Sequence, residues 1–421
     1  MVGIIAYGAY VPRLRLNRQA VYDANKWFAG GLRGLAKGER SMANWDEDSI
    51  TMAVEASRDC LTSHKPEDVR NIYFASTTHP FKDRQNAGVI GTALSIEQNL
   101  SASDVSGSLK AGTSALMAGL NASRDGAPSL VAAADKRLAR VASANELNYG
   151  DGAAALLCGT ENVIAKLIGH HSVSMDFVDH FRGDETDFDY GWEERWIRDE
   201  GYSKIVPPAI KSGLAAAKLK GSDITHFIMP SPMPAVPKQM AKACGVADGA
   251  VRDLLGANLG DTGCAHALVM LVDALETAKA GDKIMVVAFG QGVDVLVFEV
   301  TAENAKLPKR RGVSGWLARR KEEKNYMKFL AFNEMLPIDK GMRAEFDKKT
   351  ALSVLWRKRD MIYGLVGGKC KVCGTVQFPR SQVCVNPNCH AIDSQEPHRM
   401  AGLEANVMSF TADSLTYSPD P

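Results

Sequence analysis

The feature that most constrains the fold is an alternation of short β-branched runs with Ala-rich stretches over about the first 300 residues. Such runs predict buried strands and the stretches between them predict helices, so the pattern indicates an α/β fold. The expected strands cover residues 2–11, 71–77, 129–135, 153–159, 226–231 and 283–290. Residues 108–120 and 258–275 each place an Ala-rich helix beside a glycine turn, which indicates a duplicated architecture.

Two segments depart from this alternation. Residues 170–202 are polar and aromatic, and they are too long for an ordinary connection, so they form either a wall of a substrate channel or a surface excursion. Residues 306–328 carry a cluster of lysine and arginine. We interpret this cluster as a solvated linker, with a patch that binds ligand phosphates or an acidic partner as the alternative.

Length and charge narrow the class of protein. A chain of 421 residues has room for two or three domains, and its net charge of +1 gives no global reason to bind nucleic acid or membranes. The N-terminus has no basic segment ahead of its apolar start, and no apolar run approaches the ~20 residues of a membrane span. We therefore expect a cytoplasmic protein without nucleic-acid or membrane partners.

The clearest local motif is a cluster of cysteines near the C-terminus. Cys370 and Cys373 form one pair, and Cys384 and Cys389 form a second pair after a short spacer. Two such pairs can converge on one tetrahedral ion, so we predict a structural Zn²⁺ held by these four thiolates. A disulfide pair and a competing His390 ligand are the alternatives.

Four further cysteines are scattered along the chain. They are Cys60, Cys158, Cys244 and Cys264. In a chain from a reducing compartment such residues behave as small buried hydrophobic side chains, and we expect that role here.

Several stretches resemble one family, the hydroxymethylglutaryl-CoA synthases of the thiolase superfamily, particularly the archaeal type. The stretches are GIIAYGAYVPRLRL, NWDEDSITMAVEASRDCL, FASTTHPF, LKAGTSAL, GDGAAALLCG and AKAGDKIMVVAFGQG. After about residue 342 a helix, the cysteine cluster and GLEANVMSFTADSLTYSPDP are similar to the zinc-ribbon and OB-fold domain that accompanies thiolase-type enzymes acting on acyl-CoA.

The resemblance implies an α/β, duplicated, five-layered thiolase fold, followed by a helix, a zinc ribbon and an incomplete OB-fold. It also implies a homodimeric core and coenzyme A as part of the substrate. The expected parts are an N-terminal thiolase half (1–165), a C-terminal half with the insertion (166–302), a basic linker and tail (303–345), and the helix, ribbon and OB-fold start (346–421).

The family's catalytic positions are all changed in this chain. By resemblance, the nucleophilic cysteine falls at Leu109, the acid/base glutamate at Thr77, the histidine at Pro230 and the asparagine at Asp261. A leucine cannot form a thiolate, so covalent acyl transfer by the family's route is excluded at this position.

Two hypotheses follow from the missing nucleophile. In the first, the chain is a subunit that supports an active thiolase partner in carbon–carbon bond formation or cleavage. In the second, it is a cysteine-independent aldolase or retro-aldolase acting on β-hydroxyacyl-CoA. The second hypothesis needs acid/base groups, for which Asp261, His79 and His266 are the candidates, and Cys264 is a weaker candidate for a relocated nucleophile.

Overall fold

The computed structural model describes residues 1–96, 98–339 and 351–411. Two compact units are present. The main unit comprises residues 1–88 and 99–336, and the ribbon unit comprises residues 89–98 and 337–421. Among the described residues, no helix is both long and apolar enough to cross a lipid bilayer.

A large sheet organises the main unit, with strand order β11-β12-β13-β8-β1-β7-β6-β4-β5. Its first part consists of β1 (Gly3–Tyr10), β4 (Asn71–Ala75), β5 (Ser101–Val105), β6 (Ser129–Asp135) and β7 (Gly152–Gly159). Its second part consists of β8 (Ala165–Ser174), β11 (His226–Ile228), β12 (Lys283–Phe289) and β13 (Gly292–Val300).

The strand pairing of the two parts is related, as the duplicated sequence pattern predicts. In the first part, β4 and β6 are parallel, and β6, β7 and β1 then pair antiparallel. In the second part, β11 and β12 are parallel, and β12, β13 and β8 then pair antiparallel. Strand β8 joins the parts through a short pairing with β1 at Gly3 and Ile4.

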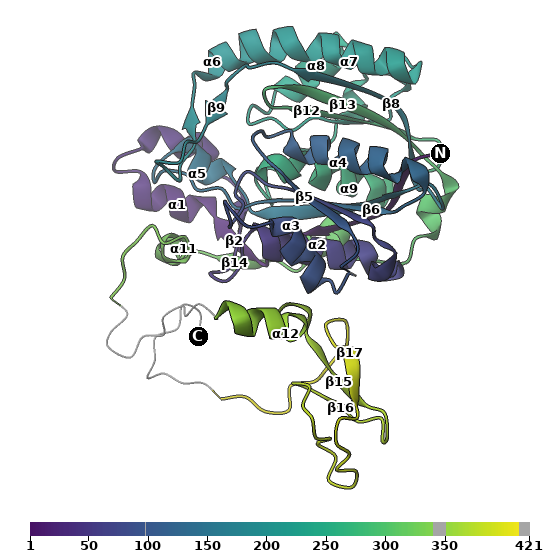
Figure 1. Ribbon diagram of the computed structural model, residues 1–421. Coiled ribbons are helices and arrows are strands. Elements are labelled where there is room, and N and C mark those ends of the chain that lie inside the picture. Colours follow the sequence, from purple (N-terminus) through teal and green to yellow (C-terminus); the bar gives the residue numbers. More distant parts are fainter. Residues whose placement is uncertain (97, 340–350, 412–421) are drawn as a thin grey trace. The chain divides into compact units, whose positions relative to one another are not determined.

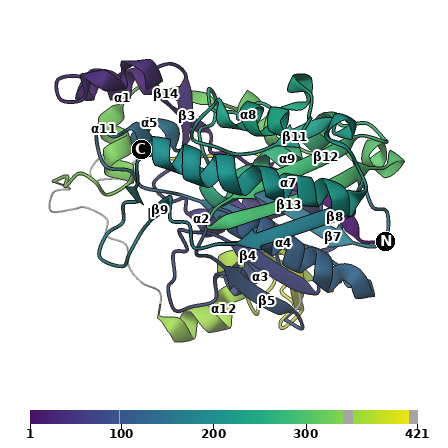
Figure 2. The same cartoon turned by 90° about the horizontal axis from the view of Figure 1, so that it is seen from above.

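Helices cover and separate the two parts of the sheet. The main helices are α2 (Ser49–Cys60), α4 (Ala111–Ala122), α7 (Ser203–Ala217), α8 (Val236–Ala243) and α9 (His266–Thr277). Figure 1 shows α7 and α8 on one outer face, α4 and α9 between the two parts of the sheet, and α2 on the opposite outer face. Figure 2 shows α7 lying over β13 and β8. This layering is that of the predicted thiolase fold.

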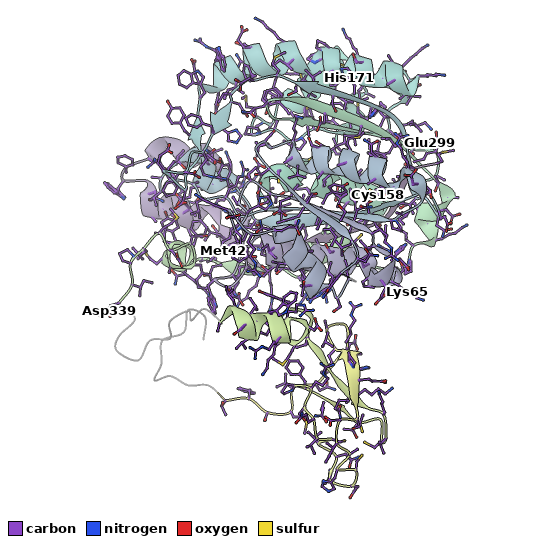
Figure 3. The ribbon with its side chains drawn as sticks, in the orientation of Figure 1. Met42, Lys65, Cys158, His171, Glu299 and Asp339 are labelled. Atoms are coloured by element: carbon purple, nitrogen blue, oxygen red, sulfur yellow. The ribbon has the colours of Figure 1, made fainter. Side chains whose placement is uncertain are left out.

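Local sequence signals explain individual elements. The Asp48 side chain accepts a hydrogen bond from the Thr51 N–H, and the Thr51 hydroxyl accepts one from the Asp48 N–H, so α2 begins with a capping box. Helices α4 and α9 are rich in alanine and other apolar residues, as expected for helices buried between two sheet parts. The scattered Cys60, Cys158, Cys244 and Cys264 are buried, and Figure 3 labels Cys158 inside the main unit.

Smaller elements complete the chain. The short strands are β2 (Leu14–Asn17), β3 (Glu39–Met42), β9 (His180–Phe181), β10 (Tyr190–Gly191) and β14 (Lys321–Glu323). The remaining helices are α1 (Arg18–Asn25), α3 (Asn86–Ala93), α5 (Ala144–Asn148), α6 (Glu194–Trp196), α10 (Gly312–Ala318), α11 (Tyr326–Phe332) and α12 (Leu352–Gly364). The ribbon strands are β15 (Val366–Cys370), β16 (Val376–Gln377) and β17 (Gln395–Arg399).

The segment predicted as a basic linker, residues 303–345, differs from a linker up to residue 336. Strand β14 pairs with β2, and α11 contributes buried aromatic side chains to a hydrophobic cluster. Its basic side chains have partners within the fold: Arg310 donates to the carbonyl oxygens of Tyr7 (2.7 Å) and Cys60 (3.2 Å). These contacts belong to the main unit, and the number of basic residues in the segment could not predict them.

The predicted OB-fold start receives no support from the described residues. The chain from 403 to 411 forms no strand, and residues 412–421 of the predicted stretch lie outside the described residues. The OB-fold therefore remains a prediction.

Candidate active site and zinc site

A cavity of about 690 Å³ opens in the main unit beside the N-terminal end of α4. Its wall includes the loop after β4, the turn between β12 and β13, and residues 179–189 of the insertion. The residues on which the argument depends are Thr77, His79, Leu109, Asp179, His180 and Arg182. The insertion thus lines a cavity that also contains Leu109 and Thr77, the residues at which the resemblance places the family's cysteine and glutamate.

An Asp–His pair faces this cavity from the insertion. His180 Nδ1 lies 3.1 Å from Asp179 Oδ1, and the two side chains are 24% and 12% exposed. A carboxylate at Nδ1 selects the tautomer with its proton on that nitrogen, which leaves the Nε2 lone pair for a ligand. Such a pair can accept and return a proton at the cavity wall.

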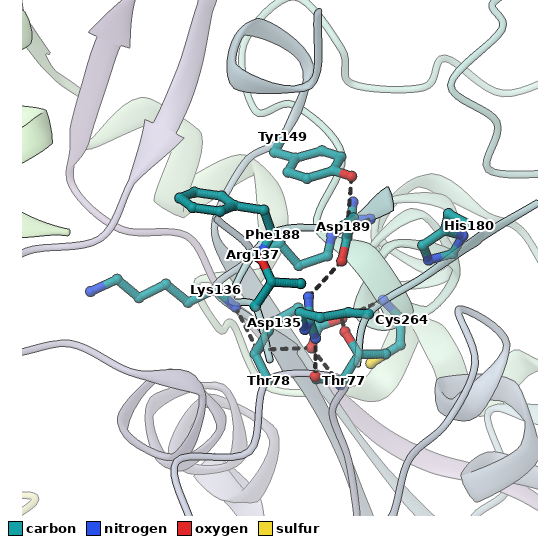
Figure 4. Close-up of polar contacts among 12 residues, drawn as sticks. Thr77, Thr78, Asp135, Lys136, Arg137, Tyr149, His180, Phe188, Asp189 and Cys264 are labelled. Carbon is teal, nitrogen blue, oxygen red and sulfur yellow. Dashed lines mark hydrogen bonds and ion pairs between the residues drawn. The ribbon is translucent and has the colours of Figure 1, made fainter. Parts of the chain in front are cut away.

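At the end of β6, Asp135 accepts hydrogen bonds from residues of two loops (Figure 4). It accepts from the Thr77 N–H (2.7 Å), the Thr77 hydroxyl (3.0 Å), the Thr78 hydroxyl (3.0 Å) and the Cys264 N–H (2.8 Å). Asp135 is completely buried, so these donors offset the cost of removing its charge from water. Asp135 fixes the position of Thr77 in the cavity wall.

A second network of charges lies next to Asp135, as Figure 4 also shows. The Arg137 guanidinium stacks over the Tyr149 ring at 3.8 Å and pairs with Asp261 (2.9 Å) and Asp189 (3.8 Å). Asp189 also accepts from the Tyr149 hydroxyl (2.8 Å) and pairs with Arg182 (2.6 Å). This network attaches the insertion to the end of β6.

The structure separates the residues that the sequence nominated. Thr77, His79 and Leu109 line the cavity, whereas Asp261, His266 and Pro230 are not among its lining residues. Although burial alone would raise the pKa of Asp261, the Arg137 guanidinium and a hydrogen bond from the Gly263 N–H hold it below its usual value. Asp261 is thus an ion-pair partner in this structure, with little tendency to take up a proton.

His266 is also committed to the fold. The Thr262 N–H donates to its Nδ1 at 3.2 Å, and its Nε2 lies 2.9 Å from the Leu254 carbonyl oxygen. Burial lowers the pKa of this imidazole, which is 3% exposed. His79 is different, because the residue lines the cavity while its Nε2 is buried and has no hydrogen-bond partner among the described residues. Burial lowers the pKa of His79 as well.

Cys264 is poorly placed to act as a nucleophile. Burial and the neighbouring Asp135 carboxylate raise the pKa of its thiol well above the usual value. Its side chain is 1% exposed and is not part of the cavity wall. A protonated, enclosed thiol is a poor nucleophile.

Sequence reasoning missed Asp179, His180 and Arg182. The available signal was their place in the sequence FVDHFRGD within an insertion too long for a simple connection. Nothing in the sequence gave the direction in which the insertion folds.

In the ribbon unit, the four predicted metal ligands converge. The Sγ atoms of Cys370, Cys373, Cys384 and Cys389 all lie within 4.8 Å of one another. Cys370 and Cys389 are 3.9 Å apart, and Cys373 and Cys384 are 3.5 Å apart. Tetrahedral Zn–S bonds of about 2.3 Å require S···S separations of about 3.8 Å. The site therefore fits Zn²⁺, and His390 is not part of this group.

The turns that carry these cysteines also fit a zinc ribbon. Gly374 has φ +75° directly after the first pair, and its N–H donates to the Cys370 carbonyl oxygen at 2.8 Å. In the second pair, Asn386 accepts from the Asn388 N–H through its side chain at 3.0 Å. With four thiolates the coordination sphere is filled, so the ion would stabilise the fold and leave no open position for catalysis.

Two family models match parts of the chain. The C-terminal domain of 3-oxoacyl-[acyl-carrier-protein] synthase III matches residues 214–298, and the rubredoxin-like zinc ribbon domain of ChsH2 matches residues 360–392. The first match lies in the second part of the main unit. The second match contains all four cysteines of the predicted zinc site.

Comparison with individual proteins extends the similarity over most of the chain. Hydroxymethylglutaryl-CoA synthase from Pyrococcus horikoshii is 29% identical over 331 residues, which cover 76% of this chain and 93% of that protein. The enzyme of the same name from Pyrococcus furiosus is 29% identical over 317 residues, or 73% of this chain and 89% of that protein.

Among solved structures, an HMG-CoA synthase complexed with CoA superposes with a TM-score of 0.68 at 16% identity. The superposition covers 83% of this chain and 95% of that structure. At this identity the structural likeness establishes the fold alone. The two Pyrococcus enzymes are more similar in sequence, at 29% identity. The chain is therefore similar in sequence to hydroxymethylglutaryl-CoA synthases, and it has a thiolase fold and a C-terminal zinc ribbon similar to that of ChsH2.

Proposed function

We propose that this chain makes or breaks a carbon–carbon bond in a β-hydroxyacyl-CoA by acid/base catalysis, without a covalent acyl-cysteine. One observation carries the proposal: a cavity that has Leu109 at the family's cysteine position also contains the Asp179–His180 pair. A wall without a thiolate but with an oriented imidazole suits proton transfer better than acyl transfer.

Coenzyme A as part of the substrate rests on the relatives. Their name identifies them as synthases of a CoA thioester, and one structural neighbour was solved with CoA bound. We carry the thioester class over to this chain, together with a homodimeric core. The Zn²⁺ held by the four cysteines has a structural role in this proposal and takes no part in the reaction.

In the cleavage direction, His180 Nε2 accepts the proton of the β-hydroxyl group. The bond between the α- and β-carbons then breaks, the β-carbon becomes a carbonyl, and the electron pair moves into the thioester enolate. The α-carbon takes up one proton, which gives a ketone or aldehyde and a shortened acyl-CoA. Protons and electrons balance without a redox partner, and condensation is the same sequence in reverse.

The neighbouring groups assist this proton transfer. The Asp179 carboxylate stabilises the imidazolium that forms when His180 accepts a proton. His79 also lines this cavity, but its Nε2 is buried and has no hydrogen-bond partner among the described residues, so His180 is the histidine placed to exchange a proton with the substrate. Thr77 is held by Asp135 and lines the same cavity.

The test is His180→Gln in the purified full-length protein. With β-hydroxyacyl-CoA substrates, we expect kcat/KM for ketone or aldehyde release to fall about 100- to 10,000-fold. His226→Gln is the matched control, because His226 also lies 3.1 Å from an aspartate, Asp282, but is not in the cavity wall. Full activity in His180→Gln would refute the proposed role.

A second candidate function is support of a cysteine-bearing thiolase, for which the ribbon unit provides a specific observation. Val372, Val385 and Ile392 are 72%, 63% and 71% exposed around the cysteine cluster. Exposed apolar side chains in one small domain favour a protein partner.

Copurification separates the two candidates. If the chain alone is inactive, and a cysteine-bearing thiolase gains activity when the two are combined, the supporting role is correct. In that case, Ile392→Ser should weaken the complex, whereas His180→Gln should leave its activity unchanged.

A further inference from the structure

The charges in the cavity wall are strongly unbalanced. Its cationic side chains are Lys82 and Arg182. Its carboxylates are Asp104, Asp179, Asp184, Asp187 and Asp189. A bound ligand therefore meets an excess of negative charge.

Both cations already have carboxylate partners. Arg182 lies 2.6 Å from Asp189, with a further hydrogen bond to the Thr77 carbonyl oxygen. Lys82 lies 2.9 Å from Asp184. Arg137, behind the wall, is paired with Asp261 at 2.9 Å. Each of these three positive charges is therefore neutralised before a ligand arrives.

The remaining three carboxylates, Asp104, Asp179 and Asp187, have no lysine or arginine ion-pair partner among the described residues. Asp104 accepts hydrogen bonds from the N–H groups of Asn86 (2.8 Å) and Ala87 (2.7 Å) at the start of α3. Asp179 is paired with His180, and Asp187 is exposed. Burial lowers the pKa of His79, so this imidazole adds no positive charge at neutral pH.

We infer that the cavity accepts β-hydroxyacyl thioesters whose acyl chain carries no carboxylate and discriminates against dicarboxylic acyl groups such as 3-hydroxy-3-methylglutaryl. This inference rests on the proposed function and names its substrate class. The free carboxylate of such an acyl group would enter a wall whose two cations are already paired and which carries three further carboxylates, Asp104, Asp179 and Asp187. It would also lose hydration without gaining a hydrogen-bonded counter-ion.

Three CoA thioesters of the same β-hydroxy skeleton test this inference by isothermal titration with the full-length protein. They are 3-hydroxy-3-methylglutaryl-CoA, the derivative with its free carboxylate converted to an amide, and 3-hydroxy-3-methylbutanoyl-CoA, which has a methyl group in place of the carboxymethyl group. The amide matches the acid in size, so their Kd ratio isolates charge. We expect the amide and the butanoyl thioester to bind about 100-fold more tightly than the acid.

Asp184→Asn sharpens the test, because it releases the Lys82 ammonium group to meet a ligand carboxylate. The Asp184 side chain is 94% exposed, so the substitution should leave the fold intact. We expect the acid-to-amide Kd ratio to fall about tenfold. Glu193→Gln removes a carboxylate from the same insertion but outside the cavity wall, and it should leave the ratio unchanged.

The outcomes distinguish this inference from the proposed function. Equal affinity for acid and amide would overturn the inference, even if both thioesters are turned over. The expected order of affinities without any turnover would support the inference and overturn the proposed function. Failure of all three thioesters to bind would overturn both.

Discussion

In the main unit, Phe298 and Leu268 are completely buried, whereas in the ribbon unit Val372 and Ile392 are 72% and 71% exposed. The main unit has a large apolar core between two sheet parts and their helices. The ribbon unit is organised by short strands and four convergent thiolates. A small domain that buries little apolar surface needs another source of stability, and a metal ion held by the four thiolates would supply it. The two units should therefore respond to different perturbations.

The largest expected effect is on the ribbon unit. Cys373→Ser leaves three thiolates, so zinc measured by atomic absorption should fall from about one ion per chain toward zero. Structural Zn²⁺ sites of this kind contribute about 10–16 kcal/mol of binding free energy to folding. Hydrogen exchange in residues 366–399 should then become fast, while the main unit stays protected.

Cys244→Ala provides the control for this change. Cys244 is buried in the main unit, distant in sequence from the ribbon cysteines, and its loss should leave the zinc content unchanged. If Cys373→Ser retained a full complement of zinc, or if the main unit lost its protection, the separation between metal-dependent and core-dependent units would be wrong.

The next largest effect is expected in the main unit, whose stability depends on its apolar core. Phe298→Ala removes a completely buried ring from β13 and should lower the free energy of unfolding of the main unit by about 3–5 kcal/mol. Ile392→Ala removes an exposed side chain and should change ribbon stability by less than about 0.5 kcal/mol. Hydrogen exchange resolved by mass spectrometry measures the two units separately. If Phe298→Ala and Ile392→Ala lowered the stability of their units by similar amounts, the proposed difference between a core-dependent and a metal-dependent unit would be wrong.

The same contrast explains what the sequence predicted. The zinc ligands lie within twenty residues, so their spacing alone specified the site. Strands such as β1, β6 and β12 were also predictable, because buried parallel or central strands are continuous apolar runs. Strand β8 was missed because its alternating polar residues, including His170 and His171, resemble a loop.

The cavity was less predictable because its residues meet only in the folded chain. Thr77 and His180 are about a hundred positions apart, and the ion pair between Arg137 and Asp189 holds the insertion in place. Asp261 was nominated on its alignment with a family asparagine, but the sequence gave no sign of its ion pair with Arg137. The basic residues after 306 were predicted to form a solvated linker because their partners are distant in the sequence. Arg320, for example, pairs with Glu39, which lies almost three hundred residues earlier.

The smallest expected effect concerns pH and the buried His266. Burial lowers the pKa of His266 below its usual 6.5, so above that pH the imidazole is neutral in both folded and unfolded chains. As the pH falls below 6.5, the unfolded chain takes up a proton that the folded chain excludes, and stability decreases toward the folded pKa. His266→Gln should cost about 1 kcal/mol at pH 7 through lost hydrogen bonds, yet flatten this decrease. Urea unfolding of the main unit at several pH values between about 5 and 7 measures both quantities. An unchanged slope would mean that His266 is protonated in the folded chain, and its hydrogen bonds from Thr262 would then need reassignment.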